Sequence, residues 1–362
     1  MLSVLAIIAL IIFAVRLFMQ GAAFGGIATD ERKERMLLSP NYRNAAFRNQ
    51  HLTPSLAKGV GFFRILYTFF FRKDRNNRPS QRLPSIKTDL VYANAGKDIL
   101  VWFGHSSYFI RANGKTILVD PVFSGHASPL PFTTRSYAGS DIYTADDMPP
   151  IDYLVITHDH WDHLDHNTVT ALQPKVRQVI TGLGTGAHLE RWGYAADMIR
   201  ELDWFEEYIP DTGFVFTALP ARHFSGRGFI RNGFLWVSFA LTTPSYRIYL
   251  GGDSGYDTHF AETGKQYGPF DLAILECGQY NTFWPYIHMQ PEETVKAAKD
   301  LRAKQLLPVH WAKFSLGLHA WDEPIKRIYA EAQRLQQPLL HPLIGEVVPL
   351  DEEGKTFSKW WE

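Results

Sequence analysis

The stretch His158-Asp159-His160-Trp161-Asp162-His163 places three histidines and Asp162 within six residues. It directly follows the apolar run 153–156, which is typical of a short buried strand. Side chains at the end of a strand are held by a rigid element, and imidazole and carboxylate groups suit zinc and similar metals. A solvent-exposed charged turn is the competing interpretation, but crowded histidines after a buried strand are costly unless they bind metal or reach solvent. The stretch therefore predicts a metal site.

Four such ligands do not complete two metal shells, so further ligands must come from later in the chain. Three candidates share one feature, since each follows an apolar run that we expect to be a strand: His223 after 214–219, Asp253 after 246–250 and His310 after 305–309. Each of them alone is more often an ordinary surface or core residue. Their common position after strands predicts that they converge on one edge of the fold.

Around this stretch the sequence predicts an α/β protein. Asn113-Gly114 between two apolar runs predicts a two-residue hairpin. We expect strands at 99–103, 108–112, 115–119, 153–156, 214–219, 234–241, 246–250, 272–275 and 305–309, and helices at 167–172, 185–192, 292–301 and 324–335. Strands dominate the first half and helices are more frequent later, which favours an αββα four-layer sandwich with helices outside two β-sheets.

The N-terminus is apolar. Residues 1–19 are interrupted only by Arg16, and we expect residues 1–20 to form a transmembrane anchor. A cleaved signal peptide is the alternative, left open by Ala22 and Ala23, although a basic n-region is missing. We expect a membrane-anchored protein of the bacterial inner membrane. The basic residues that follow favour a cytoplasmic C-terminal side, but the rule weakens for large domains and leaves the sidedness open.

The next segment, 21–96, is predicted to be a basic extension and linker that ends around Pro79 and Pro84, so that the main α/β domain spans 97–362. The net charge is zero, yet the first 87 residues are rich in Lys and Arg and the remainder is acidic. A basic segment beside an apolar one suits anionic membrane lipid, and a solvated linker is the alternative. The aromatic patch 62–71 fits either the lipid interface or packing on the domain. The acidic remainder argues against nucleic acid as a partner.

Cys277 is the single cysteine, so the chain cannot form an internal disulfide. Its place at the end of an apolar run predicts a small buried side chain rather than a nucleophile.

The sequence resembles the metallo-β-lactamase fold hydrolase superfamily, and within it the branch of N-acylphosphatidylethanolamine-hydrolysing phospholipase D-like enzymes and their bacterial relatives. The resemblance runs in order from about residue 98 to about 325. Besides the stretch at 158–165, it is carried by Trp102-Phe103-Gly104-His105, by residues 118–124, 149–152, 201–204, 251–256, 268–273 and 288–293, and by His310-Trp311. It does not cover the apolar N-terminus.

The resemblance implies a dinuclear centre with two zinc ions, although Fe or Mn also suits such a set of ligands. It implies one site held by His158, His160 and His223, and a second held by Asp162, His163 and His310, with Asp253 bridging both. Asp120 would orient the ligand turn from behind.

The implied activity is hydrolysis of a phosphodiester in a phospholipid-like substrate by a hydroxide that bridges the metals, with Asp162 and Asp253 among the catalytic residues. We expect His288 to contact the phosphoryl group or assist the leaving group; a surface residue at a helix start is the alternative. His105, His126 and His319 are predicted to be structural. A hydrolase of carbon esters, lactones or amides and a non-catalytic membrane-associated structural or regulatory protein are the alternative functions. The sequence leaves the oligomeric state open.

Overall fold

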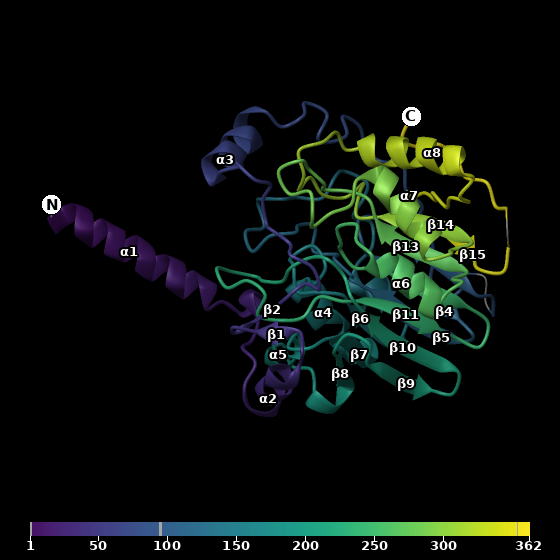
Figure 1. The fold of residues 1–362 in the computed structure, drawn as a ribbon, viewed down its shortest axis with the longest axis horizontal. Coiled ribbons are helices and arrows are strands. Elements are labelled where there is room, and N and C mark those ends of the chain that lie inside the picture. Colours follow the sequence, from purple (N-terminus) through teal and green to yellow (C-terminus); the bar gives the residue numbers. More distant parts are fainter. Residues whose placement is uncertain (1, 94–95, 353) are drawn as a thin grey trace.

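The computed structural model describes residues 2–93, 96–352 and 354–362. Residue 1 of the predicted anchor, residues 94–95 of the predicted extension and residue 353 of the predicted domain lie outside the described residues. Two β-sheets form the centre (Figure 1). The seven-stranded sheet has the order β15 (Val347–Pro349), β3 (Ile99–Trp102), β4 (Tyr108–Ala112), β5 (Lys115–Val119), β6 (Ile151–Ile156), β7 (Val176–Gly182) and β8 (Ile199–Leu202). The six-stranded sheet has the order β14 (Gln305–Val309), β13 (Leu272–Glu276), β12 (Arg247–Leu250), β11 (Ser238–Thr242), β10 (Phe214–Leu219) and β9 (Glu207–Asp211).

The alternation of side chains along β3 shows how the layers are built. Leu100 and Trp102 belong to the core between the two sheets, whereas Ile99 and Val101 belong to a second core on the opposite face. Successive residues of a strand point to opposite faces, so a strand that is apolar at every position must be covered on both sides.

Helices supply the outer cover. Residues of α4 (His166–Leu172) and α5 (Gly186–Arg191) belong to the second core of the seven-stranded sheet. On the other side, α6 (His259–Gln266), α7 (Pro291–Asp300) and α8 (Glu323–Leu335) lie along the six-stranded sheet (Figure 1). Two packed sheets with helices outside agree with the predicted sandwich.

Strand direction brings the loops of the site together. Strands β5 to β8 run parallel, so the carboxyl end of β6 lies at the same edge of the sheet as the carboxyl ends of β5, β7 and β8. In the other sheet β11 is antiparallel to both β10 and β12, and β12, β13 and β14 are parallel. Strands β10, β12, β13 and β14 therefore share one direction, and the loops that follow them leave from one edge of the sheet.

The predicted hairpin is present between β4 and β5. Asn113 and Gly114 both have positive φ, 48° and 76°, and Ala112 pairs with Lys115. Two positive φ angles are what a two-residue turn of this type requires, and Asn and Gly tolerate them best. The strand expected at 234–241 begins later, at Ser238. The sequence prediction missed β7, β8, β9, β15 and α6.

The apolar N-terminus forms a helix, α1 (Leu2–Met19), that projects from the body of the protein (Figure 1). None of the helices in residues 2–93, 96–352 and 354–362 is long and apolar enough to cross a membrane. The predicted transmembrane segment at residues 1–20 is therefore not supported.

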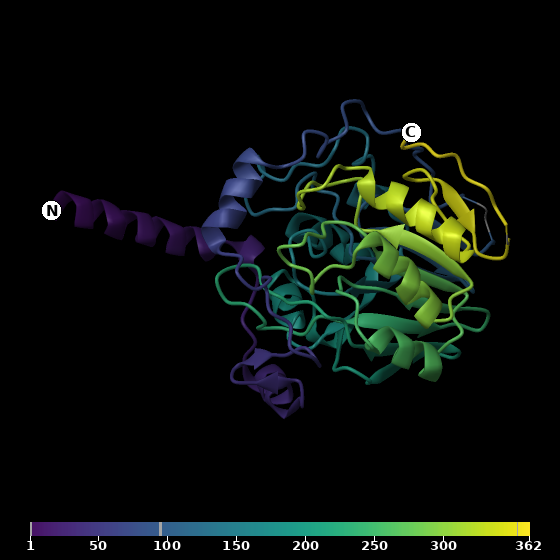
Figure 2. The same cartoon turned by 45° about the horizontal axis from the view of Figure 1, so that its top comes forward.

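The segment predicted as an extension packs on the sandwich through much of its length. Phe47 and Leu83 are completely or almost completely buried in the central core. Helix α2 (Asp30–Leu38) is held by Arg32, whose guanidinium pairs with Glu190 at 2.8 Å and with Glu201 at 2.7 Å. The aromatic patch forms α3 (Phe62–Phe71), which lies on the same side of the molecule as α1 (Figures 1 and 2).

Candidate metal centre

Residues 158–163, here called the ligand turn, follow β6 and precede α4. The turn is tight, because the His160 carbonyl accepts hydrogen bonds from the amides of His163 (3.1 Å) and Leu164 (2.8 Å). Asp165 caps α4 by accepting from the Asn167 amide, which fixes the exit of the turn. The turn therefore holds its side chains between a central strand and a capped helix.

Three imidazoles converge at one end of the site, and we call His158, His160 and His223 the imidazole group. His158 Nε2 lies 2.9 Å and His223 Nε2 lies 3.2 Å from His160 Nδ1. His223 comes from the loop after β10, so the ligand turn and the second sheet meet here. Together with Asp253, these residues can present four ligand atoms within 4.8 Å of one another.

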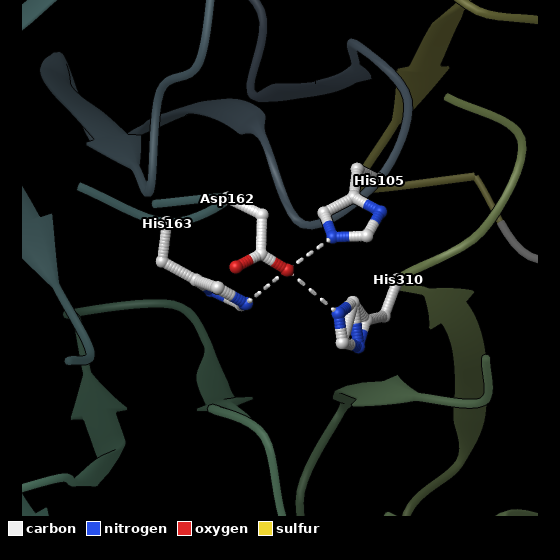
Figure 3. Close-up of side chains that lie close together, drawn as sticks. All are labelled: His105, Asp162, His163 and His310. Carbon is white, nitrogen blue, oxygen red and sulfur yellow. Dashed lines mark hydrogen bonds and ion pairs between the residues drawn. The ribbon is translucent and has the colours of Figure 1, made fainter. Parts of the chain in front are cut away.

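A carboxylate surrounded by imidazoles forms the other end, and we call His105, Asp162, His163 and His310 the carboxylate group (Figure 3). Asp162 Oδ2 lies 2.9 Å from His105 Nε2, 3.2 Å from His310 Nε2 and 3.6 Å from His163 Nε2. Figure 3 shows the three rings turned toward this one oxygen. All four side chains are buried.

Asp253 lies between the two groups. Its Oδ2 is 3.3 Å from His163 Nε2 and 3.7 Å from His223 Nε2, and its Oδ1 is 3.1 Å from His310 Nδ1. The loop after β12 thus brings a carboxylate into contact with residues from both ends. This is the position that a bridging ligand needs.

Two observations test whether the residues fit metal ions. Within the described residues, His163 Nε2, Asp253 Oδ1 and His310 Nδ1 are buried atoms that make no hydrogen bond, which is costly unless another partner satisfies them. Burial lowers the pKa values of His158, His223 and His310 well below the usual range and so favours neutral imidazole, the metal-binding form. The donor set of imidazoles and carboxylates therefore fits divalent metals such as zinc.

Burial and the neighbouring histidines act in opposite directions on the pKa values of the two carboxylates. Burial raises the pKa of Asp253 to about 6, although His163 opposes this shift. Burial acts in the same direction on Asp162, but His163 and His105 outweigh it and hold the pKa of Asp162 well below its usual range. A raised pKa means that the ionised form of the buried Asp253 carboxylate has too little positive charge around it. A bound cation would stabilise that ionised form.

Hydrogen bonds also fix the ring nitrogens of His163 and His223 that point away from the centre of the site. Asp120 Oδ2 lies 2.8 Å from His163 Nδ1, and the same carboxylate accepts from the Thr157 amide (2.8 Å) and hydroxyl (2.6 Å). His223 Nδ1 lies 2.8 Å from the Ile287 carbonyl. Hydrogen bonds of this kind fix ring orientation and raise ligand basicity. Asp120 therefore contacts the ligand turn from behind, where the resemblance implies an orienting residue.

His288 lies at the same site. Its Nδ1 is 4.0 Å from Asp253 Oδ2 and 3.5 Å from the buried carboxyl of Glu276, and its side chain is 11% exposed. It lines a cavity of about 190 Å³ together with His160, Asp162, His223, Phe224, Asp253, Gln279, Trp284, Ile287, His310 and Leu316. The predicted catalytic residues Asp162, Asp253 and His288 thus share one cavity.

Of the remaining histidines that the sequence analysis considered, two lie near the site and one lies away from it. His105, predicted to be structural, contacts Asp162, and no local pattern indicated this because the contact joins residues 57 positions apart. His319 accepts from the Gln279 amide at 2.8 Å, one residue away from the cavity wall. His126 lies apart, bonded to the Ser128 carbonyl. Cys277 is buried, as predicted. The sequence analysis missed Glu276 at the end of β13.

Comparison with known proteins gives the family. The model of the beta-lactamase superfamily domain matches residues 115–311. An uncharacterised protein of Mycobacterium tuberculosis is 38% identical over 328 residues, which cover 89% of this chain and 87% of the relative. The N-acyl-phosphatidylethanolamine-hydrolyzing phospholipase D 1 of Caenorhabditis elegans is 34% identical over 252 residues, covering 64% of this chain and 68% of that protein.

A solved structure agrees on the fold. Igni18, described as a metallo hydrolase from the archaeon Ignicoccus hospitalis, superposes with a TM-score of 0.54 at 20% identity, covering 70% of this chain and 97% of Igni18. The fold, the cluster of potential ligands and the family match lead to one conclusion: this chain belongs to the metallo-β-lactamase superfamily, as a metal-dependent hydrolase related to the N-acylphosphatidylethanolamine-hydrolysing phospholipases D.

Proposed function

We propose that this protein is a zinc-dependent phosphodiesterase that hydrolyses phospholipid-like substrates, in the manner of a phospholipase D. The observation that carries the proposal is the cavity in which Asp253 joins two groups of buried ligand atoms. In the proposal His158, His160 and His223 hold one zinc, Asp162, His163 and His310 hold the other, and Asp253 bridges them. Such a pair activates water and offsets the charge that develops on a phosphoryl group.

The chain's own residues position the substrate. His288 faces the cavity beside Asp253, and burial lowers its pKa, which favours the neutral imidazole. In this position its ring N–H can donate a hydrogen bond to a phosphoryl oxygen or to the leaving alkoxide. The imidazole needs an anchor for this role, and the carboxyl of Glu276 lies 3.5 Å from its Nδ1.

An apolar face beside the cavity supports a lipid-like substrate. On α3 the side chains of Phe63, Leu66, Tyr67 and Phe71 are exposed, and their spacing places them on one side of the helix. Helix α3 contacts the segment beside the cavity, because the Arg64 guanidinium lies over the ring of Phe283, the neighbour in sequence of the cavity-lining Trp284. Exposed apolar surface of this kind is typical of binding sites for apolar partners, so acyl chains can lie here while the phosphodiester reaches the metals.

The experiment is a substrate comparison with the full chain loaded with zinc. N-acylphosphatidylethanolamine, phosphatidylethanolamine and phosphatidylcholine are presented in mixed micelles, and phosphatidic acid is quantified. We expect phosphatidic acid from the wild type and none above background from Asp253→Ala. Asp197→Ala is the matched control, because Asp197 is an exposed carboxylate away from the cavity.

Soluble chromogenic substrates separate the proposal from its alternative. A nitrophenyl phosphodiester tests phosphorus chemistry, whereas nitrophenyl acetate and simple lactones test carbon chemistry. Turnover of the esters or lactones without any turnover of the diester would contradict the phosphodiesterase proposal and identify a carbon-ester hydrolase.

A further inference from the structure

The residues that connect α1 to α2 lie behind the ligand turn. We call residues 20–26 the strap. Four of its carbonyls accept hydrogen bonds from side chains of the domain: Gln20 and Gly25 from Arg191 (2.7 and 2.6 Å), Ala22 from Trp192 Nε1 (2.7 Å) and Ala23 from Arg227 Nε (3.0 Å). The strap lies outside the part of the chain that matches the family domain, residues 115–311.

Two glycines allow the strap to approach this closely. A Cβ atom on Gly25 would lie 1.8 Å from His188 Nδ1, and Gly25 has a φ of 78°, which side chains disfavour. A Cβ on Gly26 would lie 2.1 Å from the Ala187 carbonyl oxygen. Only glycine fits at both positions, so the strap is seated against α5 rather than lying loosely over it.

An aromatic contact joins the strap to the ligand turn itself. The Phe24 ring packs edge-to-face on Trp161 with 5.2 Å between ring centroids. Trp161 stands between His160 and Asp162, which are candidate ligands for different metals. A displacement of Trp161 would therefore move residues of both the imidazole and the carboxylate group.

Arg227 holds the same tryptophan from another side. Its guanidinium carbon lies 3.8 Å from the centroid of the Trp161 ring, and its Nη1 donates to the carbonyls of Asp159 (2.9 Å) and Leu164 (2.6 Å). These two carbonyls flank the turn that carries His160, Asp162 and His163. Arg227 is 4% exposed, and a buried guanidinium in fixed hydrogen bonds is a rigid support.

We propose that Arg227 and the strap form a positioning device for the metal ligands, in which Arg227 fixes both ends of the ligand turn and Phe24 fixes Trp161 at its centre. Neither residue touches a metal or substrate in this account. They act by holding ligand nitrogens and oxygens in a binding geometry before the metal arrives, which lowers the cost of ordering them. The metal affinity of the site then depends on a segment that precedes the ligand turn by more than 130 residues in sequence.

The test measures metal binding by the full chain, without a substrate. Zinc dissociation constants are obtained by competition with a chelator for wild type, Arg227→Gln and Phe24→Ala. Arg78→Gln is the matched control: Arg78 also bonds two carbonyls, those of Arg135 and Ser136, and lies over an aromatic ring, Tyr137. None of these residues belongs to the ligand turn.

We expect Arg227→Gln to weaken zinc binding about 10- to 100-fold, the usual effect of losing a residue that orients metal ligands. Phe24→Ala removes one aromatic contact and should weaken it about two- to tenfold. The visible absorption of the Co²⁺-loaded variants should shift, because it reports ligand geometry. Arg78→Gln should bind zinc like the wild type and leave the Co²⁺ spectrum unchanged.

The unfolding temperature of the metal-free protein separates positioning from simple stability. Variants that unfold at lower temperature but keep the wild-type zinc constants and Co²⁺ spectrum would overturn the proposal and leave the strap a purely structural contact. If Arg227→Gln does not fold, Phe24→Ala decides the question by the same two measurements. Because no reading depends on catalysis, these results stand or fall separately from the proposed activity.

Discussion

The two ends of the metal centre are built differently. In the imidazole group three rings converge without a carboxylate among them, whereas in the carboxylate group Asp162 lies among His105, His163 and His310. The first arrangement brings three ring nitrogens close together with no negative charge among them, so a bound cation would add a stabilising partner. The second already pairs a negative charge with ring nitrogens. The difference indicates that metal removal disturbs the imidazole group more than the carboxylate group.

The largest effect is expected at the residue that joins the groups. Asp253→Ala removes the contact to His163, His223 and His310 together, so zinc content should fall below one per chain. Activity should fall by more than about 10²-fold, beyond the range for residues that only orient a ligand. Metal analysis and initial rates check this, with Asp197→Ala as control. Unchanged zinc content would show that the two ends are independent.

His288→Gln should separate the chemistry from metal binding. His288 lines the cavity but belongs to neither of the two groups defined above, and the proposal therefore predicts that zinc content stays at the wild-type level. The value of kcat should fall about 10²-fold, as for loss of one hydrogen-bond donor to the reacting atoms. Steady-state kinetics and metal analysis on one sample measure both. A loss of zinc in this variant would make His288 a ligand rather than a substrate-facing residue.

Asp120→Asn acts on one end only. It weakens the support of His163 Nδ1 while keeping the size of the side chain, so metal affinity at the carboxylate group should fall about 10- to 100-fold. Chelator titration should then show one weakened and one nearly normal zinc. Equal weakening of both would mean that Asp120 supports the whole ligand turn through Thr157.

His105→Gln should have the smallest effect. It should weaken metal binding at the carboxylate group about tenfold, which is the lower end of the range for a residue that orients a ligand. Gln keeps a donor near Asp162 Oδ2 but not the ring that packs 4.1 Å from His310. Chelator titration measures it. An effect larger than that of Asp120→Asn would make His105 a ligand itself.

The ligand turn could be predicted because its residues are adjacent in sequence, and His223, Asp253 and His310 because each follows an apolar run. Other features depend on distant contacts. His105 reaches Asp162 only when β3 and β6 belong to one sheet, and β15 is a three-residue strand recognised only by its pairing with β3. The apolar residues of α1 indicated a membrane span, but none of the helices in the described part of the chain is long and apolar enough to cross a membrane. Nothing local in Phe24-Gly25-Gly26 indicates that they pack behind the site.

The most direct test of the account is the number of zinc ions bound per chain in the full-length protein, wild type beside His223→Ala and His310→Ala. The account predicts about two in the wild type and about one in each variant, since each variant removes a ligand from only one end. One zinc or fewer in the wild type, or a wild-type count in both variants, would contradict a dinuclear centre built from these residues.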